Sequence, residues 1–163
     1  MIDLDSRCSR TLHECIGRDP AHDFYVGRVH YDNVTPAGLE SESPRPGDVV
    51  CLSGYPMAVL SITPRGGFVG NVRRYWQAAF VIDATQAVIE GRKYDGYIVD
   101  QACFSGMSGR PVVDIEGNVR GMAVATLTRT IPEMDGDPHV VRNGIVVDGG
   151  QLRAFIDEHL GNS

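Results

Sequence analysis

The chain has 163 residues, 42% of them hydrophobic and 22% charged, which suits one soluble domain or two small lobes that share an interface. Its formal net charge of −6 and the lack of any Lys/Arg cluster larger than Arg73-Arg74 argue against a nucleic-acid partner. No apolar run is long enough for a membrane helix, and the N-terminus does not have the pattern of a signal peptide. We therefore expect no membrane partner, and the cytoplasm is the default compartment.

The N-terminal part of the sequence predicts two strands and a linker. Residues 11–16 and 24–29 read as strands around a turn at Gly17-Arg18-Asp19-Pro20. Residues 32–47 are polar and rich in proline, which is typical of a connector between lobes. We expect a first unit over residues 1–45 and a second unit over residues 46–163.

The second unit is predicted to be built from short strands with one helix at its end. Glu90-Gly91-Arg92-Lys93 marks a turn, residues 132–138 an exposed loop, and residues 151–160 a helix with an apolar face. Strands are expected near residues 48–53, 57–62, 67–73, 78–83, 95–99, 111–115, 119–126 and 140–147. Many short strands at regular spacing predict an all-β fold, an antiparallel β-barrel with a C-terminal α-helix.

The four cysteines do not have the spacing of metal ligands, so no metal site is expected. Cys51 and Cys103 lie in apolar runs and are predicted to be buried free thiols, while Cys8 and Cys15 could pair.

Gly106-Met107-Ser108-Gly109 is the segment with the clearest chemical meaning. Glycines on both sides of Ser108 allow a tight turn that a Cβ would forbid, and such a turn can present the hydroxyl as a nucleophile. In that turn the amides of Gly106 and Ser108 could together hold the negative oxygen of a tetrahedral intermediate. A plain solvated Ser-Gly loop is the alternative. An α/β-hydrolase elbow is disfavoured because it needs glycine where this chain has Arg110.

The residues after the turn form a β-hairpin pattern, two apolar runs around Glu116-Gly117-Asn118. With that hairpin, residues 101–126 resemble the nucleophile region of trypsin-like serine proteases, particularly the bacterial kind. Residues 46–56, 65–72 and 143–160 resemble other parts of the same family. The resemblance implies a chymotrypsin-like antiparallel β-barrel, with the C-terminal barrel complete and the N-terminal barrel partial, lacking the segment that bears the family's histidine.

The resemblance also implies roles for individual residues, with no metal or organic cofactor. Ser108 matches the nucleophile, the Gly106 and Ser108 amides match the oxyanion hole, and Asp23 matches the aspartate that orients the histidine. The substrate-binding positions would be Ala102, on the floor of the specificity pocket, and on its walls Val124, Ala125, Thr126 and Gly144. An uncharged floor favours a small or medium-sized apolar substrate side chain.

No histidine of this chain lies in the small-residue motif where the family carries its base, and each of the five is read as an ordinary surface or edge residue: His13, His22, His30, His139 and His159. Three explanations stay open: a truncated chain, a histidine supplied by another polypeptide, or loss of catalysis.

The expected function is a trypsin-like serine endopeptidase acting on peptide or protein substrates through an acyl-enzyme on Ser108. The alternative is an inactive homologue that binds peptides, and a β-barrel with a chance Ser-Gly turn is a third reading. Exposed strands in a partial first barrel also favour a homo-oligomer or a covering partner.

Overall fold

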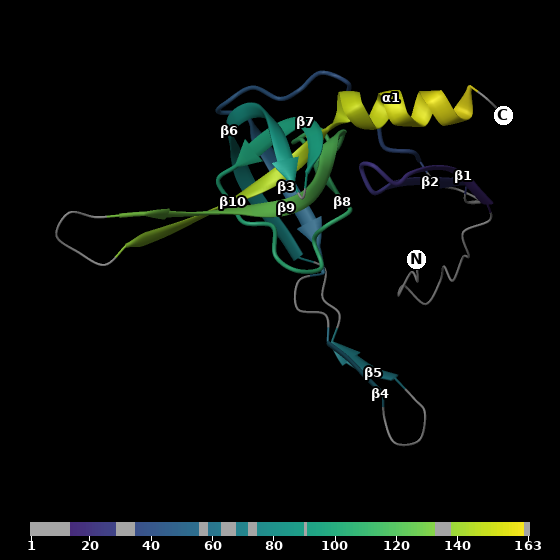
Figure 1. Ribbon diagram of the computed structural model, residues 1–163. Helices are drawn as coiled ribbons and strands as arrows, with labels where there is room; N and C mark the ends of the chain where they lie inside the picture. Colours follow the sequence, from purple (N-terminus) through teal and green to yellow (C-terminus); the bar gives the residue numbers. More distant parts are fainter. Residues whose placement is uncertain are drawn as a thin grey trace.

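A closed antiparallel barrel organises most of the chain in the computed structural model, which describes residues 14–28, 35–55, 59–62, 68–71, 75–89, 91–132 and 138–161. Its strands follow one another around the barrel in the order β10-β7-β6-β3-β8-β9 (Figure 1). Their bounds are β3 Val49–Gly54, β6 Tyr75–Ile89, β7 Arg92–Val99, β8 Arg110–Val113, β9 Val119–Ile131 and β10 His139–Asp148. The predicted all-β barrel is confirmed.

The barrel interior is filled by alternating side chains, as expected where one face of each strand points inward. In β3, Val50 and Leu52 are buried, whereas Val49, the first residue of the strand, is 41% exposed. Met107 belongs to this core although it lies outside any strand. The cluster as a whole comprises Val50, Leu52, Ala79, Val81, Tyr97, Val99, Met107, Val112, Ala123 and Val146.

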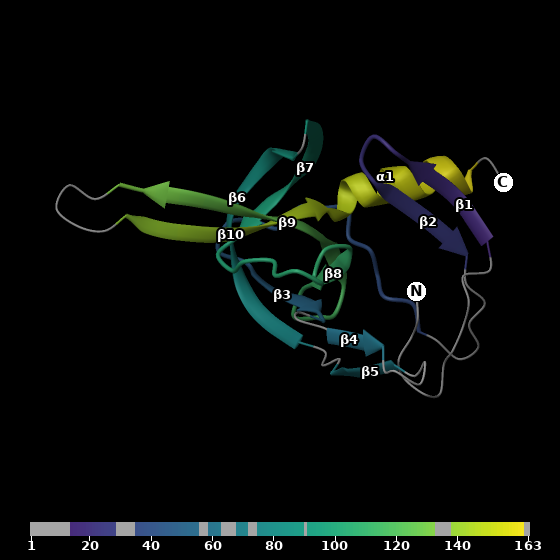
Figure 2. The same cartoon turned by 60° about the horizontal axis from the view of Figure 1, so that its bottom comes forward.

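Three further elements lie outside the barrel (Figure 2). The hairpin of β1 (Glu14–Asp19) and β2 (Phe24–Arg28) lies beside helix α1 (Gly149–Leu160), and β4 (Val59–Ile62) pairs with β5 (Phe68–Asn71). Helix α1 begins at Asp148, whose carboxylate accepts a hydrogen bond from the Gln151 amide at 2.8 Å. This N-cap explains why the helix predicted for residues 151–160 starts slightly earlier.

A second apolar cluster joins the β1–β2 hairpin to the helix and the barrel. Phe24 from the hairpin, Phe155 from the helix, and Tyr94 and Val147 from the barrel are all buried in it. The Phe24 ring lies 5.5 Å from that of Phe155 and 5.9 Å from that of Tyr94. The hairpin is therefore held mainly by aromatic packing.

The connector is attached to the barrel rather than extended away from it. Leu39 forms a parallel bridge with Val119, and the Glu40 amide donates to the Val119 carbonyl at 2.9 Å. Ser43 donates its hydroxyl hydrogen to the Asp148 carboxylate at 2.7 Å. These bonds fix residues 39–43 along the barrel next to the start of helix α1.

The turn between β1 and β2 lies later than predicted. β1 continues to Asp19, so the turn placed at Gly17-Arg18-Asp19-Pro20 is wrong; residues 20–23 turn instead. Asp19 stabilises that turn because its carboxylate accepts from the amides of Ala21 and His22 and lies 2.6 Å from His22 Nδ1. Asp23 ends the turn with a φ of 58°, a left-handed conformation that aspartate tolerates better than most residues.

Strands on both sides of the predicted Glu90–Lys93 turn are longer than expected. Gly91, with a φ of 81°, does turn, but Arg92 and Lys93 already belong to β7. β6 and β7 pair from Val81↔Val99 to Ile89↔Arg92, well beyond the barrel core. The outer residues of β6 and β7 pair although their sequence has no alternating apolar pattern that would predict strands.

The largest extension lies in β9 and β10. Beyond the barrel, Leu127–Ile131 of β9 pair with His139–Asn143 of β10, and we call this two-stranded segment the arm (Figure 1). The predicted strand had ended at residue 126. Of the predicted loop at 132–138, residues 133–137 lie outside the described residues, as do residues 11–13 and 29 of the first two predicted strands.

We predict that Phe24→Ala lowers the free energy of unfolding by about 3–5 kcal/mol, because the cavity left by a buried aromatic ring is not refilled. Urea denaturation measures the change. Tyr25→Ala is the matched control, since the neighbouring Tyr25 side chain is 51% exposed and its loss should cost much less. Equal effects of the two substitutions would contradict the docking of the hairpin through Phe24.

We also predict a pH effect at the β1–β2 turn. The hydrogen bond from the His22 side chain is the main cause that holds the Asp19 pKa below its usual value. Burial acts in the opposite direction, and the hydrogen bonds from the Ala21 and His22 amides lower the pKa further. Because the folded-state pKa is lowered, this stabilisation is present at neutral pH and is lost as the pH falls through that pKa.

Replacing His22 by alanine should therefore raise the Asp19 pKa toward its usual value, and the acid-dependent loss of stability that comes from Asp19 should become smaller. Carboxyl NMR titration of Asp19 measures the shift. His139→Ala, on β10, serves as the control and should leave Asp19 unchanged. An unaltered Asp19 titration in the His22 variant would contradict the assignment.

Candidate active site

The Ser108 turn, residues Phe104–Arg110, is held on both sides by the barrel. Gly106 and Gly109 have φ values of 89° and 77°, which a residue with a Cβ rarely adopts. The Gly109 amide donates to the Ala123 carbonyl at 2.8 Å, and the Arg110 amide to the Met107 carbonyl at 3.1 Å. The predicted tight turn between glycines is thus present, directly before β8.

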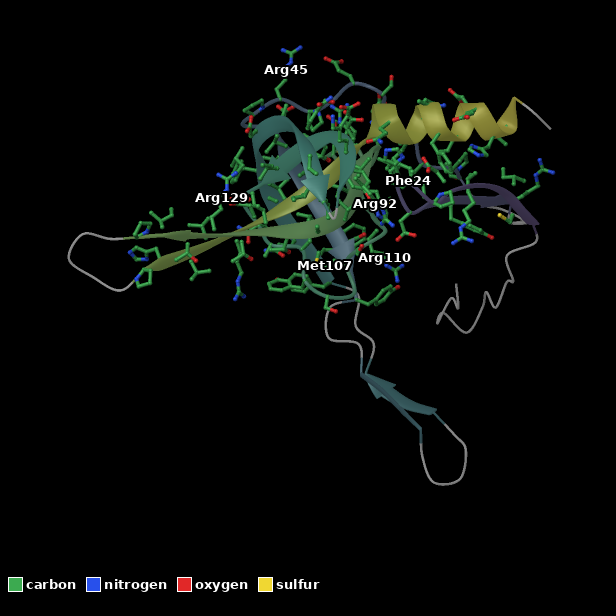
Figure 3. The ribbon with its side chains drawn as sticks, viewed as in Figure 1. Phe24, Arg45, Arg92, Met107, Arg110 and Arg129 are labelled. Atoms are coloured by element: carbon green, nitrogen blue, oxygen red, sulfur yellow. The ribbon has the colours of Figure 1, made fainter. Side chains whose placement is uncertain are left out.

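Met107 fixes this turn in the barrel core. Its side chain is fully buried and lies against Gly54 at the end of β3, where an added Cβ would come within 2.6 Å of Met107 Cγ. Ser108, the next residue, is exposed. Burial of one residue therefore orients its neighbour toward solvent. Figure 3 shows Met107 and Arg110 at one end of the barrel, with Phe24 beside helix α1.

Two amides of the turn are free to bind a ligand. Within the described part of the chain, the Gly106 and Ser108 amides donate to no other group, whereas those of Met107, Gly109 and Arg110 all have carbonyl partners. Unpaired amides that flank a nucleophile are what an oxyanion hole requires.

The Ser108 hydroxyl donates to the Val124 carbonyl oxygen at 3.1 Å. This bond joins the turn to β9 at the point where β8 stops pairing with it, since the last β8–β9 pair is Arg110↔Ala123. In the structure as described, the hydroxyl is therefore engaged by a backbone acceptor and not by a side-chain base.

The predicted substrate-binding residues lie around this point. Thr126 pairs with Gly144 across β9 and β10, and its hydroxyl donates to the Cys103 carbonyl at 2.6 Å. Ala102, Val124 and Ala125 are half-buried. At Gly144 an added Cβ would lie 2.6 Å from the Gln101 carbonyl oxygen and 2.7 Å from Cys103 Sγ. The structure thus brings the 101–103 segment against the 124–126 strand and Gly144.

Sequence reasoning treated Cys103 only as a buried thiol, but it is half-buried and lies between Ala102 and Gly144; Cys51 is half-buried as well. Burial raises the pKa of the Cys103 thiol to about 11. It therefore stays protonated at neutral pH, and because the thiolate is the reactive form, Cys103 is a poor nucleophile. Cys15 is an exposed free thiol, and Cys8, the partner considered for it, lies outside the described residues.

Sequence reasoning also missed Tyr55, which follows β3 directly. Its ring lies 4.7 Å from the guanidinium carbon of Arg110, and its amide donates to the Gly106 carbonyl at 3.5 Å. An arginine over an aromatic ring is a favourable cation–π contact. Arg110 thus has a structural contact, whereas the sequence alone showed only that position 110 is not glycine.

Asp23 and the Ser108 turn share one cavity of about 480 Å³. The cavity lies between the β1–β2 hairpin, helix α1 and the barrel, and its walls are largely apolar. Asp23 lines it from the hairpin, Gly109 from the turn, and Phe155 from the helix. Asp23 and the residue that follows Ser108 thus border a common space, although Ser108 itself does not line it.

The three described histidines lie in the β1–β2 turn, the arm and helix α1, and none is hydrogen-bonded to Ser108. His22 contacts Asp19, as described above, and its ring stacks against Phe24 at 5.7 Å. His159 Nδ1 lies 2.8 Å from the Phe155 carbonyl oxygen in helix α1, and His139 lies on the arm. Among the described residues no group of three or more His, Cys, Asp or Glu side chains could hold a metal ion. The only helix described, α1, is too short to cross a membrane.

Comparison with solved structures shows the same fold. The Rv3671c protease from M. tuberculosis in its active form superposes with a TM-score of 0.63 at 20% identity, over 90% of this chain and 57% of that one. The HtrA-type protease AlgW with a tripeptide gives 0.57 at 20% identity, over 88% of this chain and 42% of that one. The MamO protease domain from Magnetospirillum magneticum gives 0.57 at 14% identity, covering 86% and 65%.

The chain therefore spans less than two thirds of the length of these proteins. No curated protein sequence matches it. The trypsin-like peptidase domain matches residues 7–122, most of the chain and all of the Ser108 turn. The expected resemblance is thus confirmed, and the chain belongs to the trypsin-like peptidase family.

Proposed function

We propose that this chain carries the nucleophile half of a trypsin-like serine endopeptidase, with Ser108 as the nucleophile. The observation that carries the proposal is the Ser108 turn, where Ser108 is exposed and the Gly106 and Ser108 amides have no partners in the described residues. The Gly106 and Ser108 amides form the oxyanion hole in this proposal. Its two units are residues 1–45 and residues 46–163.

The reaction is acyl transfer followed by hydrolysis. Ser108 Oγ attacks the carbonyl carbon of a peptide bond while an imidazole base takes its proton, and the oxyanion lies against the two amides. The carbon–nitrogen bond then breaks, and the base gives its proton to the leaving amine. The same base then takes a proton from water, which attacks the ester carbonyl. The base gives that proton to Ser108 Oγ as the acid product leaves. The chemistry uses no metal and no organic cofactor.

In this proposal Asp23 orients the imidazole base. The shared cavity supports this role, because Asp23 and Gly109 line the same space of about 480 Å³. The base must reach Ser108 from outside the described residues of this chain, for example from another polypeptide. An imidazole in the cavity would contact the apolar walls and the Asp23 carboxylate together, and such a partner would also cover the β1–β2 hairpin.

The residues around Ser108 suggest how a peptide is read. Ala102 forms the floor of the pocket for the residue before the cleaved bond, and Val124, Ala125, Thr126 and Gly144 form its walls. Two contacts support a narrow pocket: the close approach of Cys103 to Gly144, and the Thr126 bond to the Cys103 carbonyl. With no charge among these side chains, a small or medium-sized apolar residue fits best.

A second candidate function is peptide binding without catalysis. The observation that favours it is the Ser108 hydroxyl bond to the Val124 carbonyl at 3.1 Å, which uses the hydrogen that a base would take. A homologue without the base would keep the barrel and the strand that pairs with peptides. The first experiment separates the two functions.

We predict that a fluorophosphonate labels Ser108 slowly, and that added imidazole accelerates the labelling. A positioned base contributes about 10²–10⁴-fold, so free imidazole, which lacks positioning, should recover only part of this, about tenfold. Mass spectrometry of the intact chain measures the rate.

Ser108→Ala should abolish the labelling, whereas Ser105→Ala, an exposed serine of the same turn, should leave it intact. A folded chain that shows no labelling with or without imidazole would reject the enzyme in favour of the binding module. Fast labelling without imidazole would show that the chain supplies its own base.

We also predict that Ala102→Asp redirects the pocket toward basic residues. Diphenyl phosphonates with a valine or an arginine side chain test this in the presence of imidazole. The unmodified chain should react faster with the valine reagent, and the variant with the arginine reagent, by about tenfold or more, as expected for a charge pair in a partly buried pocket. Ala84→Asp, at an exposed position of β6, is the matched control. The same preference in all three proteins would overturn the placement of Ala102 on the pocket floor.

A further inference from the structure

One edge of the arm is open along its whole length. β9 pairs with β8 only up to Ala123, while its pairing with β10 continues to Ile131. From Val124 to Ile131, among the described residues, the side of β9 away from β10 has no strand partner. Figures 1 and 2 both show the arm projecting from the barrel. Alternate residues of this edge therefore present unpaired backbone N–H and C=O groups.

The open edge begins at the proposed nucleophile. Ser108 Oγ donates to the carbonyl of Val124, the first residue without a β8 partner. An extended chain that continues the sheet along this edge would consequently end at Ser108. The edge of the arm and the site at the Ser108 turn are one continuous surface.

We propose that the open edge of β9, from Val124 to Ile131, binds an extended peptide that carries an acidic residue opposite Arg129. This inference rests on the proposed peptide site at Ser108 and extends it far upstream of the cleaved bond. β9 runs away from Ser108, so a peptide in the commoner antiparallel orientation runs toward Ser108. The arm would thus contact peptide residues that lie N-terminal to the cleaved bond.

The side chains of the arm indicate which peptide fits. Residues directly opposite in the β9–β10 ladder share a face, so Arg129 lies with Val141, and Leu127 and Ile131 flank it two residues away on the same face. A peptide in register, with the residue at the cleaved bond opposite Val124, would place the fifth residue before that one opposite Arg129, and cross-strand neighbours of opposite charge are favourable. Apolar residues two positions to either side would face Leu127 and Ile131.

Charge also distinguishes the arm from the rest of the molecule. The chain as a whole has a formal charge of −6, whereas the described arm residues contain no acidic side chain and two arginines, Arg129 and Arg142. Both arginines are exposed, and they lie on opposite faces because they occupy positions of different parity in the ladder. Within the described residues neither forms an ion pair. Among the described residues Arg129 therefore has no charged partner, while Glu133, Asp135 and Asp137 of the connecting segment lie outside them.

A long exposed edge favours an occupant. Uncovered edges attract other strands, and natural proteins shorten, charge or cover them. On β9 the edge carries one charge and no proline before Pro132, and 50% of the Ile131 side chain is exposed. A second copy of the chain is the competing occupant, and the test distinguishes it from a peptide.

The test uses the full chain with Ser108→Ala, so that binding is measured without acylation. Ten-residue fluorescent peptides of alternating threonine and valine end in alanine and differ only at the fifth residue before that alanine, which is Glu, Gln or Lys. Fluorescence polarisation should give tightest binding for Glu and weakest for Lys, with about a twofold to fivefold change at each step.

Arg129→Glu should reverse this order, whereas Arg142→Glu, a matched charge reversal on the other strand and face, should preserve it. Circular dichroism confirms that both variants are folded. Hydrogen exchange should show peptide-induced protection in residues 126–131 of β9 and not in residues 139–143 of β10.

The proposal is overturned by the absence of binding, by an order that Arg129→Glu leaves unchanged, or by protection on β10. It is also overturned if the chain sediments as a dimer with the β9 edge protected before peptide is added, since a second copy then occupies the edge. Fluorophosphonate labelling of Ser108 is independent of these results. If the chain binds the peptides but Ser108 is never labelled, the proposed enzyme function is rejected and the peptide-binding edge stands. If Ser108 is labelled but no peptide binds, only the peptide-binding edge is rejected.

Discussion

The contact between Met107 and Gly54 determines the orientation of the Ser108 turn. Met107 is fully buried in the barrel although it belongs to a turn, and it fits only because Gly54 leaves room for it at the end of β3. With Met107 fixed inside, Ser108 must point outward, and the glycines on either side absorb the backbone conformations that result. Ser108, the proposed nucleophile, is therefore positioned by core packing.

The two halves of the fold differ in how much they depend on other parts. The barrel closes through β10-β7-β6-β3-β8-β9, so its main strands have hydrogen-bond partners on both sides where they surround the core. The β1–β2 hairpin instead forms a sheet by itself and is held by aromatic packing against helix α1. An architecture with one self-sufficient part and one dependent part explains why the cavity next to Asp23 is large and apolar.

Much of the barrel and the turn could be predicted from the sequence because their signals are local. Alternating apolar residues, glycines at turns and an apolar helical face identified the strands, the Ser108 turn and helix α1 closely. The β9 half of the arm was missed because Thr128, Arg129 and Thr130 have no apolar alternation, and their strand forms through pairing with β10. The Arg110–Tyr55 contact and the cavity shared by Asp23 and Gly109 join residues distant in sequence, and no local pattern encodes such distances.

The docking of the β1–β2 hairpin against helix α1 has a consequence for the order in which the chain can fold. The hairpin, residues 14–28, is synthesised before helix α1, which carries Phe155, the residue on which Phe24 packs. Until then the Phe24 ring has no aromatic partner from the helix. The hairpin therefore reaches its final position only after helix α1 has been synthesised, and until then its exposed aromatic ring is a binding site for chaperones that shield such rings.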